Sequence, residues 1–356
     1  MRILCFIGGI VLAKRIEWID YFKGIGILLV VYGHVIVGLQ GSNTISQHNP
    51  YNISNIIIYG FHMPLFFFAS GIFADKWAKN TFLLAVKQKL TTIIYPYFIW
   101  VMITGSFMSI ASKFTNNHQS WSELLKSPVH PFSIYWYLYC LFFLFILYYF
   151  SKRVMSLNVI MIFSIIYYIS SPFLNFWILS DVGKYFVFFV LGIYVYNKKG
   201  INIFGKLNNK NILIHTIASA IIFAIVSFIY VYSYFLLSEY PVHIIYLIIS
   251  ISGIGFTLFI SVLLSRVKKL IVIKYFGKIS LVIYVSHLIP QAGARIIIMK
   301  FGGIKNASLH IIIGTVIGMV IPIIIYEVSK KKNLYPVLFG YKLKEKEYSD
   351  LNNMRI

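Results

Sequence analysis

The chain has 356 residues, of which 59% are hydrophobic and only 12% are charged, and its mean hydropathy is +0.79. Soluble domains carry about a quarter charged residues, so this composition excludes a soluble globular protein. The formal net charge of +22 does not indicate nucleic-acid binding, because the basic residues lie in short clusters between apolar runs rather than along one face.

Apolar runs recur along the chain, and each is long enough to cross a hydrocarbon core of roughly 30 Å as a helix. Helices are the expected form because backbone polar groups in lipid must be satisfied within the segment. Residues 1–17 are interpreted as an interfacial N-terminal extension, since their apolar stretch has a poor signal-peptide cleavage site. The sequence predicts an all-α, polytopic membrane protein with ten spans, at 18–39, 53–74, 90–111, 132–150, 157–172, 176–196, 212–237, 242–264, 272–293 and 308–328.

The segments that join these spans alternate between rich and poor in Lys and Arg. This alternation predicts that both termini lie in the cytoplasm. We expect one ten-helix membrane domain at 18–328 and a basic cytoplasmic tail at 329–356 that contacts anionic membrane lipid. No internal repeat is visible, which weakens the interpretation as an inverted-repeat transporter. Cys5 and Cys140 have neither metal-type nor disulfide spacing, so we expect apolar fillers and no metal site.

The first span contains three ionisable residues, and such residues inside a membrane are costly and usually functional. At 100° per residue, Asp20 and Lys23 both fall within about 40° of His34 on a helical wheel. His34 lies about 16 Å beyond Lys23 along the axis. The pattern predicts a buried imidazole above an acid–base pair. The alternative is an interfacial anchor pair and a histidine that hydrogen-bonds a neighbouring helix.

Two later spans carry further polar groups. Residues 61–71 read FHMPLFFFASG, in which Pro64 is expected to kink the helix and Ser70–Gly71 to allow close backbone approach. In the ninth span Ser280, Tyr284 and His287 share one helical face and suggest the wall of a polar cavity. Helix-packing hydrogen bonds are the alternative role for these residues and for His62.

Two features of the middle spans have simpler interpretations. Asp181 and Lys184 are three residues apart in the sixth span and are expected to form an ion pair. Trp136 falls near the end of the fourth span, where an aromatic belt at the membrane interface would explain it.

The first span also carries a more specific pattern, Arg15-x4-Asp20-x2-Lys23-Gly24 followed by His34. It resembles the signature of acyltransferase family 3, whose hallmark is a basic residue, ten intervening residues and a histidine. Arginine is commoner than lysine at the first of these positions. Other segments resemble family motifs in the expected order, and FHMPLFFFASG is most similar to the fucose 4-O-acetylase-like branch. These further segments are Tyr95-Pro96-Tyr97 with Trp100, Trp136-Tyr137-Leu138, and Gly277 to His287.

The resemblance implies a bacterial inner-membrane enzyme that moves an acyl group, usually acetyl from acetyl-CoA, to a hydroxyl of a lipid-linked or polymeric glycan such as O-antigen or capsule. It implies catalytic roles for His34, Lys23 and Asp20, and donor binding by Arg15 and Lys23. Substrate binding is expected from His62, Ser70, Trp136, Ser280, Tyr284 and His287. The alternatives are transfer of succinyl or another acyl group, and a transporter or flippase for glycan intermediates. Neither the acceptor sugar nor the oligomeric state follows from the sequence.

The expected chemistry needs a base, because the acceptor hydroxyl loses its proton as it attacks the thioester. Burial favours the neutral imidazole, so His34 is the expected proton acceptor. Tyr284, Ser280 or His287 would stabilise the developing oxyanion or orient the sugar. A covalent acyl-His34 intermediate is the alternative route.

Overall fold

The computed structural model describes residues 16–46, 49–110, 124–200, 204 and 207–341. Within these residues the chain is helical and contains no β-strand, so the predicted all-α class is confirmed. The helices are α1 (Glu17–Gly41), α2 (Pro50–Tyr59), α3 (His62–Gly71), α4 (Ala74–Trp77), α5 (Phe82–Lys89), η1 (Leu90–Ile94), α6 (Tyr95–Ile110), η2 (Ser133–Tyr135), α8 (Trp136–Val154), α9 (Leu157–Ser170), η3 (Ser171–Phe173), α10 (Trp177–Lys199), α11 (Asn209–Leu236), α12 (Glu239–Val267), α13 (Ile271–Lys278), α14 (Ser280–Ser286), α15 (Leu288–Ile296), η4 (Ile297–Phe301), α16 (Ala307–Lys331) and α17 (Tyr335–Phe339).

The long helices have the length and composition of membrane spans. Among the described residues eight helices pass this test, or nine if the bent pair of α14 with the helix that begins at Leu288 counts as one span. The predicted span at 157–172 corresponds to a shorter apolar helix, Leu157–Phe173. The protein is therefore a polytopic membrane protein, while the count of ten and the orientation of the termini stay predictions.

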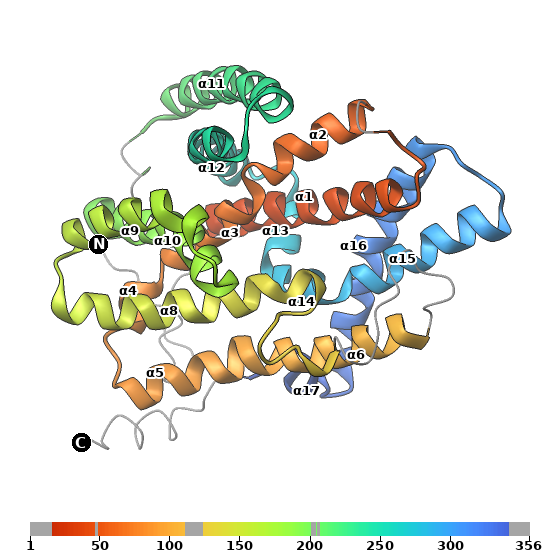
Figure 1. Ribbon diagram of the computed structural model, residues 1–356, viewed down its shortest axis with the longest axis horizontal. Helices are drawn as coiled ribbons and strands as arrows, with labels where there is room; N and C mark the ends of the chain where they lie inside the picture. The colour runs from red at the N-terminus through yellow and green to blue at the C-terminus, as the bar shows by residue number, and fades with distance from the viewer. Residues whose placement is uncertain (1–15, 47–48, 111–123, 201–203, 205–206, 342–356) are drawn as a thin grey trace.

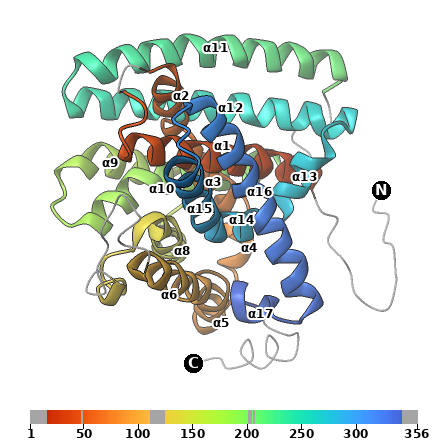
Figure 2. The same ribbon diagram turned by 90° about the vertical axis from the view of Figure 1, so that its right-hand side faces the viewer.

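The outermost helix, α11, shows how the chain meets lipid. It packs on α12, as Figures 1 and 2 both show. Its free side carries exposed apolar side chains at helical spacing, which are Ile214, Ile217, Ile221, Ile225 and Phe228. Such a surface is stable against acyl chains and unstable in water.

Helix α1 lies in the middle of the bundle, in contact with α3, α12, α13 and α16 (Figures 1 and 2). It crosses α13 closely because glycines meet there. A Cβ atom on Gly277 would lie 1.7 Å from the carbonyl oxygen of Asp20, and one on Gly24 would lie 1.9 Å from that of Ile273. This crossing fixes the start of α1, and with it the register of Lys23 and His34.

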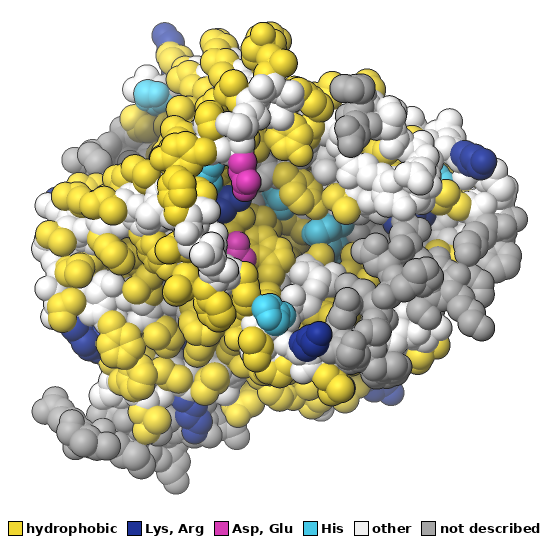
Figure 3. All heavy atoms as spheres, in the orientation of Figure 1, with side chains coloured by type: hydrophobic (Ala, Val, Ile, Leu, Met, Phe, Trp, Pro, Cys, Tyr) yellow, Lys and Arg dark blue, Asp and Glu magenta, His cyan; other side chains and the backbone are white. Residues whose placement is uncertain are grey.

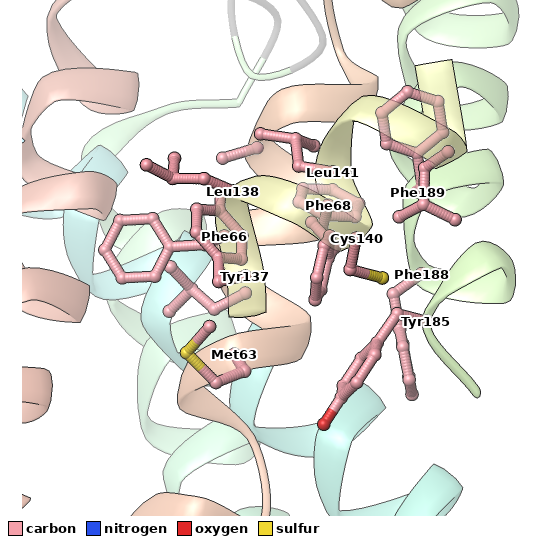
Figure 4. Packing of buried hydrophobic residues seen from close by; sticks show 14 of the residues in the cluster. Met63, Phe66, Phe68, Tyr137, Leu138, Cys140, Leu141, Tyr185, Phe188 and Phe189 are labelled. Carbon is pink, nitrogen blue, oxygen red and sulfur yellow. The ribbon is translucent and has the colours of Figure 1, made fainter. Parts of the chain in front are cut away.

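The predicted close approach at Ser70–Gly71 is confirmed. A Cβ atom on Gly71 would lie 2.0 Å from the carbonyl oxygen of Phe189, so α3 and α10 are in backbone contact there. Figure 4 shows the aromatic core that surrounds this contact, with Phe68 of α3 and Phe188 of α10 among its members. Cys140 packs in the same core as a fully buried free thiol, in keeping with its predicted role as apolar filler.

Two of the predicted spans are broken rather than continuous. The span predicted at 272–293 divides into α13, α14 and α15, and the axis bends by 46° between α14 and α15. Pro290 explains the bend, since it has no N–H to donate to the carbonyl of Ser286 one turn earlier. The span predicted at 53–74 breaks at Gly60–Phe61, and Pro64 lies in the first turn of α3, where no backbone donor is required.

The predicted N-terminal extension lies mostly outside the described residues, and so does the tail from residue 342 onward. The described end of the chain is attached to the bundle. Helix α17 packs against α6, and the Trp100 indole N–H donates to the carbonyl of Leu338 at 2.8 Å.

Candidate functional site

Three cavities lie along α1 and make up the candidate site. The lysine cavity, about 310 Å³, surrounds the early part of the helix and includes Lys23 and Lys89. The arginine cavity, about 550 Å³, and the tyrosine cavity, about 370 Å³, lie further along it. The arginine cavity contains Arg295, and the tyrosine cavity contains Tyr185 and several other tyrosines. Their volumes are typical of sites that bind small molecules.

His34 stands where the arginine and tyrosine cavities meet. Its partly exposed ring lines both, together with Tyr59, Ile134 and Trp136. The Tyr59 hydroxyl lies 3.4 Å from His34 Nδ1. Figure 3 shows a hollow on one apolar face of the molecule in which histidine, acidic and basic side chains gather. A ligand in either cavity would therefore reach the same imidazole.

His287 lies behind His34 and has a fixed hydrogen-bonding role. It occupies the bend between α14 and α15, is fully buried, and its ring centroid is 5.2 Å from that of His34. Its Nδ1 lies 2.9 Å from the carbonyl of Ile283 and 2.8 Å from that of Tyr284. Carbonyls only accept hydrogen bonds, so Nδ1 carries the proton and Nε2 presents a lone pair. This Nε2 is buried without a hydrogen-bond partner.

His62 also reaches the tyrosine cavity and has the same tautomer. Its Nδ1 donates to the carbonyl of Ile58 at 2.8 Å, which leaves Nε2 as an acceptor. Its ring packs against Tyr59 at a centroid distance of 4.6 Å. The two rings are three residues apart in the chain, across the turn between α2 and α3, and both line the tyrosine cavity.

The lysine cavity combines two cations with a largely apolar wall. Lys23 of α1 and Lys89 of α5 both line it, and so do Ser70 and Ser280. The Lys89 ammonium lies 3.4 Å from the centroid of the Phe145 ring, a cation–π contact. Lys89 ends α5, and the π-helix η1 that follows contributes Thr92 and Ile93 to the cavity. Short π-helical turns often occur at functional sites.

Tyr284 separates the lysine cavity from the tyrosine cavity, because it lines both. Its hydroxyl donates to the carbonyl of Ile134. Its ring packs edge-on against Tyr137 at 5.3 Å, and the Tyr137 hydroxyl lies 3.3 Å from Ser70 Oγ. The two cavities are thus neighbours on opposite sides of a tyrosine layer.

Comparison with known proteins decides which class of function this arrangement serves. A family model described as an acyltransferase domain, that of acyltransferase family 3, matches residues 16–327. The chain belongs to acyltransferase family 3. No curated protein and no solved structure matches it. Family membership favours a membrane acyltransferase over the transporter that the sequence left open.

The structure divides the predicted residues of this acyltransferase between the cavities. His34, His62 and Trp136 lie beyond Tyr284, and Lys23, Ser70 and Ser280 lie before it. Trp136 lines two cavities, so its place is not explained by an aromatic belt alone. Two predicted residues line none of the three cavities: His287 supports His34 from behind, and Asp20 is buried in the α1–α13 crossing. Arg15 lies outside the described residues.

Several residues of the site were missed by the sequence analysis. Tyr59, Gln291 and Arg295 line cavities that contain His34. A usable signal existed for Arg295, which is a cation two residues beyond the predicted span 272–293 and directly before the apolar residues 296–299. A signal also existed for Tyr59, which precedes His62 by three residues in the predicted span 53–74, because this spacing places two side chains on one helical face.

One predicted ion pair is not a direct contact, although Asp181 and Lys184 lie near enough for their charges to interact. No ion pair joins Lys184 to Asp181 in the described structure, and the Lys184 ammonium lies 4.4 Å from the centroid of the Tyr246 ring. The cation–π contact replaces the ion pair because Tyr246 of α12 reaches across to α10.

The acyltransferase histidines are not arranged as metal ligands. Among the described residues no group of three or more His, Cys, Asp or Glu side chains could hold an ion. The imidazoles of His34 and His287 instead lie side by side, with their ring centroids 5.2 Å apart and the tautomer of His287 fixed by backbone carbonyls.

Proposed function

We propose that this acyltransferase moves an acetyl group from acetyl-CoA to a hydroxyl of a lipid-linked or polymeric cell-surface glycan. The observation that carries the proposal is the position of His34. Its imidazole lies at the meeting point of two cavities, and a third cavity with two lysines lies before it along the same helix. We also propose that both termini are cytoplasmic and that the enzyme resides in a bacterial inner membrane, which places the lysine cavity on the cytoplasmic side.

The lysine cavity suits the donor. Lys23 and Lys89 offer ammonium groups to the phosphates of a coenzyme A thioester. The pantetheine arm of such a donor is long and thin, and it separates the thioester from the phosphates. The separation of about 16 Å between Lys23 and His34 along α1 requires a donor of this shape. To reach His34, the arm passes Tyr284, whose contact with Ile134 must then open.

The cavities beyond Tyr284 suit the acceptor. Trp136 and the tyrosines of the tyrosine cavity offer flat aromatic surfaces on which sugar rings stack. His62 lines the same cavity, and its Nε2 is available as a hydrogen-bond acceptor for a sugar hydroxyl because Nδ1 carries the proton. A saccharide held there would present its hydroxyl to His34.

His34 acts as the base and His287 orients it. Because His287 Nε2 is a buried lone pair, we expect it to accept a hydrogen bond from His34 Nε2–H in the reactive arrangement. This leaves the lone pair on His34 Nδ1, the nitrogen near Tyr59, to take the proton of the acceptor hydroxyl. The arrangement follows the general logic of a catalytic base held in one tautomer by a second acceptor.

The chemical step balances without another reactant. The acceptor oxygen attacks the thioester carbonyl as its proton passes to His34, and the carbon–sulfur bond breaks. The proton then goes from His34 to the departing thiolate, which leaves as coenzyme A thiol. In the alternative route His34 itself attacks the thioester, and the glycan hydroxyl attacks the resulting acyl-imidazole.

The test is transfer of labelled acetyl from acetyl-CoA to glycan by the purified protein in lipid. We expect label in an ester that mild alkali releases, and none with His34→Gln. His215→Gln is the matched control, because His215 is exposed on α11 and lines none of the three cavities. Normal labelling by His34→Gln would eliminate both routes.

The finer assignments are tested by changing the substrates. The likeness of residues 61–71 to the fucose 4-O-acetylase-like branch makes a deoxyhexose-containing glycan the first acceptor to try. Succinyl-CoA is the competing donor, and it should lose to acetyl-CoA in a mixed-donor assay if the space beside His34 accepts only a small, uncharged acyl group. Preferential transfer of succinate would replace acetyl in the proposal.

A further inference from the structure

Arg295 is a cation that neither topology nor ion pairing explains. It lies in α15, beyond His34 relative to Lys23, in the part of the bundle that the charge pattern leaves poor in basic residues. The ion pairs among the described residues do not include it. A cation held inside a membrane domain without a carboxylate is costly unless a ligand uses it.

The guanidinium lies directly against α1. A Cβ atom added to Gly38 would lie only 2.1 Å from Arg295 Nη1, so the absence of a side chain at Gly38 makes room for the guanidinium. Gly38 follows His34 by four residues, on the same face of α1. The guanidinium therefore lies about 6 Å along the helix axis from the catalytic imidazole, and both line the arginine cavity.

The rest of this cavity offers hydrogen-bond acceptors. Gln291 donates to the carbonyl of Val31 at 2.7 Å, and its Oε1 is buried without a partner. His310 donates to the carbonyl of Ile304 at 2.9 Å through Nε2, and its Nδ1 is buried without a partner. Both residues line the cavity, and a ligand rich in hydroxyl donors would suit them after a small adjustment.

The tyrosine cavity differs from the arginine cavity in the charged groups that line it. Lys184 lies there with the carboxylate of Glu239, so an anion would meet a cation and an acid together. Of the described residues that line the arginine cavity, none is Asp or Glu. An anionic group is therefore favoured beside Arg295 and not beside Lys184.

We infer that the arginine cavity is a subsite for an anionic group on the acceptor, held on the side of His34 opposite to Lys23 along α1. The inference rests on the proposed function and narrows its acceptor to a hydroxylated ligand that carries a carboxylate or phosphate. The planar guanidinium matches either anion through paired hydrogen bonds. The anion comes from an acidic sugar or from the diphosphate of a lipid-linked saccharide.

Direct binding without acetyl-CoA tests this inference independently of the transfer reaction. The probes are an oligosaccharide that contains glucuronic acid, the same oligosaccharide with its carboxyl groups reduced, and a neutral saccharide carried on polyprenyl diphosphate or free. We expect wild-type protein to bind at least one anionic probe about 10–100 times more tightly than its neutral counterpart. The pair that shows the preference identifies the source of the anion.

Variants then assign the preference to Arg295. Arg295→Gln should abolish it and leave binding of the neutral probes unchanged, and Arg295→Lys should restore only part of it. Gly38→Ala should act like Arg295→Gln because its methyl group displaces the guanidinium. Gly293→Ala is the matched control, since a Cβ atom there has no neighbour within 4 Å. Retained acetyl-CoA binding by each variant shows that it is folded.

Three results would overturn the inference. One is equal affinity of wild-type protein for the anionic and neutral probes. Another is a preference for the anionic probes that survives Arg295→Gln. The third is an equal loss of affinity for charged and neutral probes in Arg295→Gln, which would show that Arg295 only packs α15 against α1. Failure of acetyl transfer with the anion preference intact would instead refute the proposed function alone.

Discussion

The two ends of α1 differ in the chemistry of the cavities beside them. Near Lys23 the polar groups are mainly ammonium and hydroxyl groups on an otherwise apolar wall. Beyond Tyr284 they are mostly imidazoles, phenols and amides, with the Arg295 guanidinium in the arginine cavity and an ammonium beside a carboxylate, Lys184 and Glu239, in the tyrosine cavity. The first set suits a phosphate-bearing donor that is held and released, and the second suits an acceptor that is oriented and deprotonated. One helix can therefore keep two substrates apart and still bring their reactive atoms together.

The largest effect is expected at His34. His34→Gln removes the base but keeps much of the side-chain volume, and acetyl transfer should fall about 10²–10⁴-fold. Acetyl-CoA affinity should not change, because the site proposed for the donor phosphates is at the other end of α1. Transfer rate and donor dissociation constant are measured on the same preparation, with His215→Gln as control. Weaker donor binding by His34→Gln would contradict the assignment of donor and acceptor to opposite ends of α1.

The next largest effect is expected for His287→Phe, which tests the acceptor end of α1. The aromatic ring is kept and both nitrogens are lost, so His34 loses the acceptor that we propose fixes its tautomer. We expect kcat to fall about 10–100-fold while KM for donor and acceptor stays the same. A rise in acceptor KM at unchanged kcat would show that His287 binds substrate, as the sequence analysis expected.

The lysine end is tested by Lys23→Gln and Lys89→Gln. Each variant should raise the donor KM about tenfold and leave the acceptor KM unchanged. Added salt should weaken donor binding to wild-type protein more than to either variant, because it screens the lost attraction. Lys278→Gln is the control, since Lys278 is exposed and lines none of the cavities. If donor binding depended equally on salt in all of these proteins, Lys23 and Lys89 would not take part in donor binding.

The sequence predicts much of this arrangement and misses the rest for identifiable reasons. The 11-residue step from Lys23 to His34 lies within one unbroken helix, so helical geometry alone places both correctly on α1. Tyr284 and His287 were expected on one face, but the bend near Pro290 sends Tyr284 to the cavities and His287 behind His34. Arg295 and Gly38 are far apart in sequence, and helical periodicity carries no information about such a contact.

The smallest effect is expected outside the cavities, at Asp75. Burial alone would raise the pKa of this carboxyl, but hydrogen bonds from Lys152 and Tyr148 outweigh it and leave the pKa below its ordinary value. Asp75→Asn should cost about 1 kcal/mol of stability at neutral pH and leave donor and acceptor kinetics unchanged.

The pH dependence of that effect follows from the lowered pKa. The stabilisation by Asp75 is complete above the ordinary carboxyl pKa, about 3.9, and is lost as the pH falls through the lower folded-state value. Thermal unfolding midpoints of wild-type and Asp75→Asn protein should therefore converge only in strong acid. A difference that stays constant down to such pH would mean that Asp75 acts through shape and not through charge.

The division of α1 into donor and acceptor ends is tested most directly by a cryo-EM structure with a non-hydrolysable acetyl-CoA analogue. The account predicts phosphates at Lys23 and Lys89, a pantetheine arm that passes a displaced Tyr284, and the acyl end facing the cavities that meet at His34. Phosphates beside Arg295, or an acyl group that stays on the lysine side of Tyr284 with no route to His34, would contradict it.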